Sequence, residues 1–258
     1  MIRQIPQTIA LLCAALLIAG AAWPLARAQA QAGGEQPVYT YVAMWGVPRA
    51  QWTQVEKYYK DAEPALKKLV ADGTLVGWGN GRLWVHDDSG YTHASWTTAT
   101  SFADISRAGA AIHAALPLPA AFNTAKHADE FLRSTIHAGK PGISGSGMLW
   151  VANYHVRPGQ MEEFTRLFEA EIKPLFDEQL ATGTVLFYGL NFQAIHTGAP
   201  GGATIAYLMP DAAAIDKFQA ALAEYGANHP DTGPALEAVL DLAAHRDYVY
   251  EVINFAQK

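Results

Sequence analysis

The chain has 258 residues, of which 50% are hydrophobic and 16% are charged, enough apolar material for hydrophobic cores. Its 24 acidic residues outnumber its 18 basic ones and give a formal net charge of −6. A mildly acidic chain without a Lys/Arg run argues against a nucleic-acid partner, because nucleic-acid binding rests on neutralising phosphates.

Residues 1–30 have the pattern of a secretory signal peptide. Arg3 supplies the positive start, and residues 9–22 form an apolar run before a small-residue ending, Ala-Gln-Ala. A membrane anchor is the alternative, but the run falls short of the roughly 20 residues that span a bilayer. We therefore expect an exported protein, periplasmic or secreted, that is soluble and has no membrane partner after cleavage. The mature chain would lack Cys13, the one cysteine, and so have no disulfide, thiolate metal ligand or thiol nucleophile.

The mature chain resembles itself at a spacing of 110 residues. LVADGTLVGWG (69–79) is similar to QLATGTVLFYG (179–189). Further matched pairs are Pro48 with Pro158, Pro64 with Pro174, Gly73 with Gly183, and His86 with His196. One extra residue is expected after this stretch in the second copy, where Ala94-Ser95-Trp96 aligns with Ile205-Ala206-Tyr207. This pattern predicts two repeats, 37–138 and 148–256, with a glycine-rich linker at 139–147.

Each copy predicts the same elements in the same order. Strands rich in β-branched and aromatic residues come first, at 38–47 and 148–156. A helix follows in each copy, opened by Pro48 or Pro158, ended by Gly73 or Gly183, and kinked or broken at Pro64 or Pro174. Two hairpins follow, 74–86 with 91–98 and 184–196 with 203–209, then second helices from about 101 and 211. Further helical segments are expected at 127–136 and 234–244, and a closing strand at 248–255, with no obvious counterpart in the first copy.

This order of elements is that of the ferredoxin-like unit. Two such units in one chain resemble the dimeric α/β-barrel superfamily, the antibiotic-biosynthesis-monooxygenase type, over residues 37–256. The resemblance implies an α+β fold in which two βαββαβ repeats pack as a pseudo-dimeric α/β barrel, as a monomer or a homodimer. It also implies a site for a small hydrophobic or aromatic molecule, since members include cofactor-independent monooxygenases and haem-binding proteins.

Strand alternation suggests where such a site could lie, because alternate residues of a strand share a face. In the first hairpin one face carries Trp78, Asn80, Arg82, Trp84, His93, Ser95 and Thr97. The opposite face carries Leu83, Val85, Ala94 and Trp96, which we expect to pack against the helices. In the second copy Asn153 and His155 share a face, and the spacing matches Tyr41 with Val151 and Trp45 with His155. The predicted ligand-binding residues are Tyr41, Trp45, Trp78, Trp84 and Tyr188, unless these side chains simply fill the interior.

Three functional hypotheses remain open. The first is cofactor-free oxygenation of an electron-rich aromatic molecule, with His93 or His155 as base and Arg82 or Asn153 polarising an oxyanion. The second is haem binding, which needs one axial histidine, drawn from His113, His127, His137, His229 and His245 near the second helices. The third is a non-catalytic structural or interaction domain. No metal-binding motif is present, so no metal site is predicted.

Overall fold

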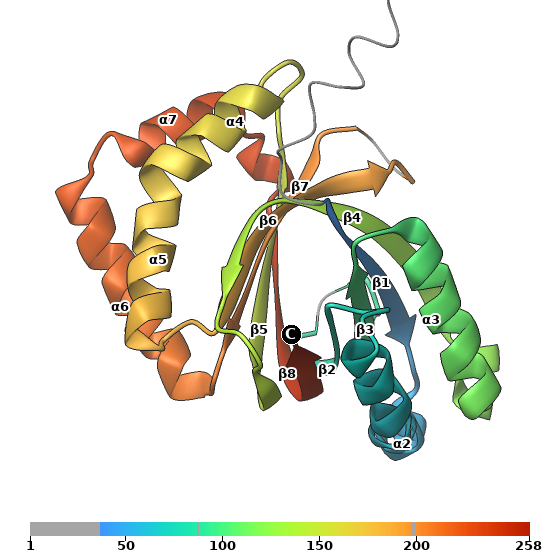
Figure 1. Cartoon of the computed structure of the whole chain (residues 1–258). Coiled ribbons are helices and arrows are strands. Elements are labelled where there is room, and N and C mark those ends of the chain that lie inside the picture. The colour runs from blue at the N-terminus through green and yellow to red at the C-terminus, as the bar shows by residue number, and fades with distance from the viewer. Residues whose placement is uncertain (1–36, 87, 198–199) are drawn as a thin grey trace, which may run out of the picture. The chain divides into compact units, whose positions relative to one another are not determined.

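The structure is a computed structural model that describes residues 37–86, 88–197 and 200–258 (Figure 1). The predicted signal peptide lies outside the described residues. Residues 37–258 form one compact unit. No helix in the described part of the chain is long and apolar enough to cross a membrane.

Both repeats contain the elements that the sequence predicts, with one exception. The first repeat comprises β1 (Val38–Gly46), η1 (Arg49–Gln51), α2 (Trp52–Ala71), β2 (Gly77–Leu83), β3 (His93–Ala99), α3 (Phe102–Ala115), η2 (Ala120–Asn123) and β4 (Lys126–Gly139). The second comprises β5 (Ser144–His155), α4 (Met161–Leu167), η3 (Phe168–Ile172), α5 (Lys173–Thr182), β6 (Phe187–Ile195), β7 (Gly202–Met209), α6 (Ala212–Asn228), α7 (Thr232–Val239), η4 (Leu242–Ala244) and β8 (Arg246–Gln257). Ser101 and Asp211 cap α3 and α6 by accepting from the backbone N–H groups of Asp104 and Ala214.

The exception is the end of the first repeat. Residues 127–136, predicted to be helical, belong to β4, and the predicted linker 139–147 is largely strand, with only 140–143 between β4 and β5. The first repeat therefore has its own fourth strand. The sequence of β4 mixes helix-forming and charged residues, and tertiary pairing decides its conformation, because β1 binds one of its edges and β6 the other.

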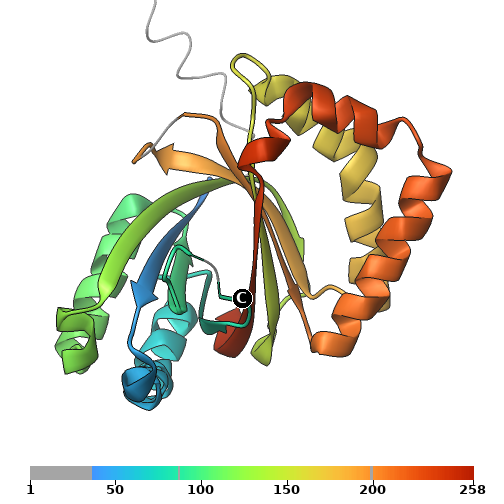
Figure 2. The ribbon, with the colours of Figure 1, turned by 180° about the vertical axis from the view of Figure 1, so that it is seen from behind.

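The eight strands close into one antiparallel barrel in the order β1-β3-β2-β8-β5-β7-β6-β4. Each repeat contributes four adjacent strands, and the repeats join along two seams, β2 with β8 and β4 with β6. Helices α2 and α3 cover the barrel on one side, and α4 to α7 cover it on the other, as the views from front and back show (Figures 1 and 2). The predicted α+β fold of two repeats packed as a pseudo-dimeric barrel is confirmed.

The strand register shows where the two repeats differ in length. Trp78 pairs with Thr97 and Tyr188 pairs with Tyr207, so the hairpins keep the 110-residue spacing. The extra residue expected in the second hairpin is therefore a wrong prediction. In the first strands the spacing is one shorter, since Tyr41 pairs with Thr97 whereas Trp150 pairs with Tyr207.

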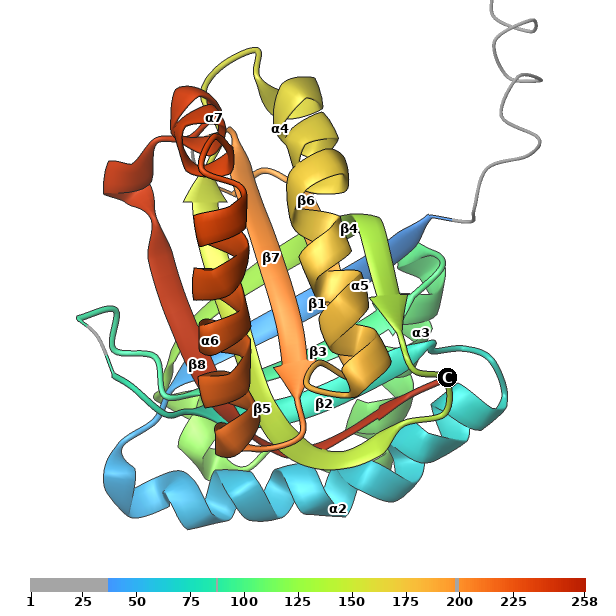
Figure 3. The same ribbon diagram turned by 90° about the vertical axis from the view of Figure 1, so that its left-hand side faces the viewer.

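A π-helix takes up the difference of one residue. Helix α2 begins at Trp52 and α4 at Met161, a spacing of 109 residues. At the ends of the two long helices the spacing is 110 residues, as equivalent backbone hydrogen bonds show: Leu75 N donates to Leu69 O, and Val185 N donates to Gln179 O. Between these points the second copy contains η3, a π-helical segment, and one inserted residue is what such a bulge accommodates. Helix α2 continues unbroken through Pro64 (Figure 3).

The side chains that face the barrel interior also differ from the prediction. Leu83, Ala94 and Trp96 do not pack against helices, as predicted from alternation, but meet strand residues of the other repeat, including Leu149, Leu208 and Tyr250. Gly79 makes room there, because an added Cβ would lie 2.1 Å from the Trp96 ring. The polar and aromatic face of the first hairpin consequently points outward, toward α2 and α3.

Candidate functional site

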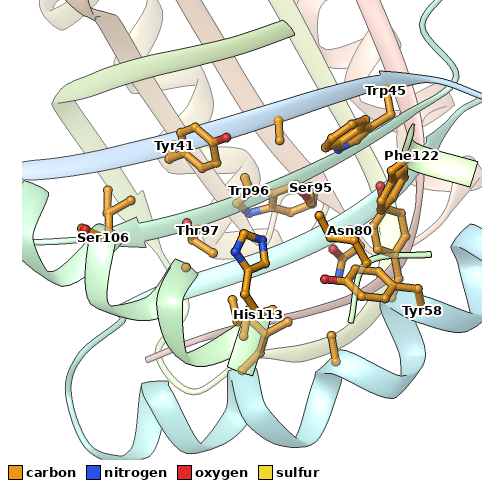
Figure 4. Close-up of a pocket in the computed structure, with 18 of the residues that line it drawn as sticks. Tyr41, Trp45, Tyr58, Asn80, Ser95, Trp96, Thr97, Ser106, His113 and Phe122 are labelled. Atoms are coloured by element: carbon orange, nitrogen blue, oxygen red, sulfur yellow. The ribbon is translucent and has the colours of Figure 1, made fainter. Parts of the chain in front are cut away.

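A cavity of about 370 Å³ lies in the first repeat between the outer face of the sheet and helices α2 and α3 (Figure 4). Strand β1 contributes the alternate residues Tyr41, Ala43 and Trp45 to it, and its cross-strand partner β3 contributes Ser95, Trp96 and Thr97. The lining residues are Tyr41, Ala43, Trp45, Tyr58, Tyr59, Ala62, Leu66, Asn80, Ser95, Trp96, Thr97, Phe102, Ile105, Ser106, Gly109, Ile112, His113, Leu118, Phe122 and Phe131.

Aromatic rings form the walls. Trp45 stacks on Phe122 with ring centroids 4.2 Å apart, and Tyr58 meets Phe122 edge-on at 5.7 Å. On the other side Phe102 stacks on Phe131 at 4.5 Å. Such rings offer large, flat apolar surfaces, which favour a flat apolar ligand.

A buried amide network holds the sheet side of the cavity. Asn80 Nδ2 donates to Asn254 Oδ1 at 2.9 Å, and Asn254 Nδ2 donates to Tyr59 O and Glu63 Oε2, both at 3.1 Å. Asn254 lies on β8, so the second repeat helps to orient a cavity residue of the first across the seam. This network fixes the Asn80 amide, which lines the cavity beside Ser95, its cross-strand partner.

Tyr59 presents an unused hydrogen-bond donor. Its hydroxyl is buried and has no partner, and burial raises the pKa of the phenol far above its usual range. A buried donor left without an acceptor costs roughly 1–3 kcal/mol.

Tyr41, another phenol that lines the cavity, has a hydrogen-bond partner. The Tyr41 hydroxyl donates to Asp129 Oδ1 at 2.6 Å, and His127 Nε2 lies 2.9 Å from the same oxygen. The His127 ring stacks on Trp45 at 3.7 Å. Burial, and then the hydrogen bond to Asp129, raises the pKa of Tyr41, which keeps the phenol neutral and its proton on the Asp129 side.

Larger, buried side chains stand at the equivalent positions of the second repeat. Asn80, Ser95 and Thr97 correspond in register to Leu190, Ile205 and Tyr207. The latter three lie in a buried core together with Phe164, Phe168, Phe176, Tyr188 and Phe218. Small polar residues in the first repeat thus leave open what larger residues close in the second.

The predicted ligand-binding residues fall in three places. Tyr41 and Trp45 line the cavity. Trp78 is buried with Leu66 and Leu69 of α2, and Tyr188 is buried in the core of the second repeat. Trp84 is 54% exposed and lies outside the cavity.

Two predicted catalytic residues, His93 and Arg82, are cross-strand neighbours that are not among the residues lining the cavity. His93 is fully buried, with Nδ1 2.9 Å from Thr92 Oγ1 and Nε2 without a partner. Burial, followed by the charge of Arg82, lowers the pKa of His93 to about 4. Arg82 is engaged by Glu56 at 2.9 Å and Glu251 at 2.5 Å.

The other two, Asn153 and His155, belong to the barrel side of the second repeat. They alternate with Ala152 and Tyr154, which pack toward the helices, and Asn153 Oδ1 accepts from Thr204 Oγ1 at 2.8 Å. The structure therefore does not bring the four predicted catalytic residues together. The helix-covered faces of the two repeats lie on opposite sides of the barrel (Figure 1), which separates the two pairs. The one-residue difference in strand spacing in addition turns Asn153 and His155 to the barrel side, because it reverses the face of every side chain in β5 relative to the expected match.

The histidines considered as haem ligands are also spread out. His113 of α3 lines the cavity, and His229 and His245 follow α6 and η4. His127 and His137 lie on β4 and not on a helix, which corrects their predicted placement. Within the described residues no group of three or more His, Cys, Asp or Glu is placed to hold a metal ion.

Sequence reasoning placed Asn80, Ser95 and Thr97 on the right face but missed the opposite wall. Tyr58 and Tyr59 are carried on α2, and only the docking of the helix decides which of them reach a cavity. The sequence did not indicate Asp129 as a partner of Tyr41, because residues 127–136 were predicted to be a helix and not a strand paired with β1.

Comparison with known proteins finds structural neighbours only. No family model and no curated protein sequence matches the chain. A candidate monooxygenase from Lactobacillus acidophilus has a TM-score of 0.61 at 11% identity, covering 86% of this chain and 97% of its own. One from Fusobacterium nucleatum has a TM-score of 0.60 at 12% identity, with 86% and 94% covered, and an anthrone oxidase-like protein has 0.50 at 10% identity, with the same coverage.

The chain has the dimeric α/β-barrel fold. At identities this low the likeness concerns the fold, and a fold by itself does not select an activity. What the dimeric α/β barrel explains is the position of the cavity, between one sheet and its own pair of helices.

Proposed function

We propose that the chain binds a small, uncharged aromatic molecule in the cavity of the first repeat. The observation that carries this proposal is the contrast between the repeats, since equivalent positions are open and polar in one and filled in the other. None of the described lining residues is Asp, Glu, Lys or Arg, whereas aromatic walls and a few fixed polar groups are typical of small-molecule sites. The same contrast speaks against the non-catalytic hypothesis of a completely filled interior.

Oxidation by O2 is the reaction we propose if the bound molecule is turned over. The names of two neighbours, both candidate monooxygenases, and of the anthrone oxidase-like protein support this choice by analogy of fold alone. For a ring CH2 next to an activating hydroxyl or carbonyl, CH2 and O2 give C=O and water. His113 is better placed as the base than His93 or His155, because it lines the cavity.

Haem binding is the less favoured alternative. His113 could supply an axial nitrogen, but the described lining residues include no Lys or Arg to pair with the two propionates. We therefore expect the purified protein to show no Soret band after incubation with haemin. A Soret band that is lost in His113→Ala would instead establish haem as the ligand.

Filling the cavity with the residues of the second repeat tests the proposal. We expect Ser95→Ile with Thr97→Tyr to abolish binding of naphthalene, naphthol and naphthoquinone, because the introduced side chains occupy their space. Quenching of tryptophan fluorescence and native mass spectrometry measure binding. Thr53→Ile, at an exposed position of α2, is the control and should bind like the wild type.

Unchanged binding in a folded double variant would refute the cavity as the site. Oxygen consumption with the bound probes then separates turnover from simple binding. Export is a further part of the proposal, and the mass of the protein recovered from the exported fraction would show whether cleavage occurs near residue 30.

A further inference from the structure

Two of the three phenols that line the cavity, those of Tyr59 and Tyr41, differ in their hydrogen bonding. The Tyr59 hydroxyl is buried and has no partner. The Tyr41 hydroxyl already donates to Asp129 Oδ1 at 2.6 Å, so toward the cavity its oxygen can only accept. Figure 4 shows the Tyr41 side chain on β1 with its hydroxyl oxygen.

His127 helps to hold the Asp129 carboxylate where it accepts the hydrogen bond from Tyr41. His127 Nε2 lies 2.9 Å from the same carboxylate oxygen, and the His127 ring is stacked on Trp45 at 3.7 Å. The register places Tyr41 opposite Phe131 and Ala43 opposite Asp129, so all these side chains share the cavity face of the sheet. Further titratable groups on this side are His113 on α3 and Tyr58 on α2, which line the cavity, and the register pair Tyr39 and Arg133 beyond Phe131.

We propose that Tyr41, positioned by Asp129, makes the cavity selective for aromatic molecules that carry a neutral hydroxyl group. This inference rests on the proposed function and names its ligand class as phenols and naphthols. The ligand hydroxyl donates to Tyr41 Oη, which accepts well because its own proton is drawn toward a carboxylate. A phenolate finds no donor at Tyr41 and meets the negative charge of Asp129, so it is rejected.

Nitrophenol and nitrobenzene are a matched pair of probes, since they differ by the hydroxyl group and the nitrophenol anion absorbs at a longer wavelength. We expect the wild type to bind neutral nitrophenol about five- to tenfold more tightly than nitrobenzene, as one added hydrogen bond allows. Tyr41→Phe should reduce that ratio to about one, while the affinity for nitrobenzene is retained.

Asp129→Asn separates positioning from a merely structural role. The amide no longer holds the Tyr41 proton as a carboxylate does, so Tyr41 can donate to the probe. At one fixed pH the ratio of ionised to neutral bound nitrophenol should then rise about tenfold over the wild type. The matched control is the Tyr188–Asp177 pair, with a 2.5 Å hydrogen bond but outside the cavity, so Tyr188→Phe and Asp177→Asn should leave both readouts unchanged.

Each outcome decides between the ideas. Equal nitrophenol-to-nitrobenzene ratios in the wild type and Tyr41→Phe would overturn the role of Tyr41, and an unchanged absorbance in Asp129→Asn would overturn that of Asp129. In both cases the cavity would still bind aromatic molecules, so the proposed function would stand. If neither probe binds the wild type, the proposed function fails and this inference fails with it.

Discussion

At the scale of single residues, the polar groups of the first repeat are distinguished by what each one already binds. Tyr41 is committed to Asp129 and Asn80 to Asn254, whereas Tyr59 and the Nε2 atom of His93 have no partner. A buried polar group without a hydrogen-bond partner lowers the free energy of unfolding, and the size of this effect depends on whether a ligand binds the group and on its charge.

His93 predicts a dependence of stability on pH. Its folded-state pKa of about 4 lies below the usual 6.5, so between these values the unfolded chain binds more protons and stability rises with pH. Lowering the pH from 7 to 5 should therefore cost up to about 2 kcal/mol through this group. Urea unfolding at both pH values measures it.

A neutral substitution isolates the contribution of His93. In His93→Gln the loss of stability between pH 7 and 5 should shrink by about 1–2 kcal/mol, whatever the substitution costs at pH 7. His137→Gln, at an exposed site on β4, should leave the difference as in the wild type. An identical pH dependence in His93→Gln and the wild type would show that His93 is not held neutral.

At the scale of elements, the long helix of each repeat shows how one inserted residue is absorbed. Helix α2 is regular, whereas its counterpart is divided by the π-helix Phe168–Ile172. The bulge keeps Phe164 and Leu167 on the buried face before it and Leu175 and Phe176 on the buried face after it. Without the bulge, an extra residue would turn one half of the helix by about 100°.

Deletion of one residue from the π-helix should therefore be tolerated. We expect removal of Glu169, an exposed residue, to give a continuous α-helix and to change the free energy of unfolding by no more than about 1 kcal/mol. Removal of Lys60, which is exposed in the regular helix α2, should cost more than roughly 3 kcal/mol, because half of the buried face turns to solvent. Equal losses in the two deletions, measured by urea unfolding, would contradict this account.

At the scale of the whole molecule, the two repeats are joined along both seams of the barrel. Seam β2–β8 carries the Asn80–Asn254 bond, and seam β4–β6 carries the bond from Ser134 Oγ to Asn191 Oδ1 at 2.6 Å. An isolated repeat would expose both edge strands and the inner face of its sheet. We therefore expect the repeats to fold as one unit, although each has its own helices.

Cutting the chain between the repeats tests this unity. We expect cleavage at a protease site inserted in the turn 140–143 to leave the halves associated in size-exclusion chromatography and native mass spectrometry. After separation in urea, neither half should regain a cooperative unfolding transition alone, whereas the mixture should. A single half that refolds as a stable monomer would show that the repeats are independent domains.

Local patterns in the sequence determined most of the architecture. The 110-residue repeat, the strand and helix periodicities and the capping residues predicted two ferredoxin-like units, because these signals act within a few residues along the chain. The same alternation grouped Asn80 with Ser95 and Tyr41 with Trp45, all of which line the cavity.

Only the tertiary structure decided β4, the faces of the barrel and the composition of the site. Strand β4 is set by pairing with β1 and β6, which lie far from it in sequence. A period of two tells which residues share a face but not whether that face meets helices or the barrel interior, and a spacing change of one residue reverses it. Asn153 and His155 face the barrel side for that reason, and Asp129 reached Tyr41 across 88 residues of chain.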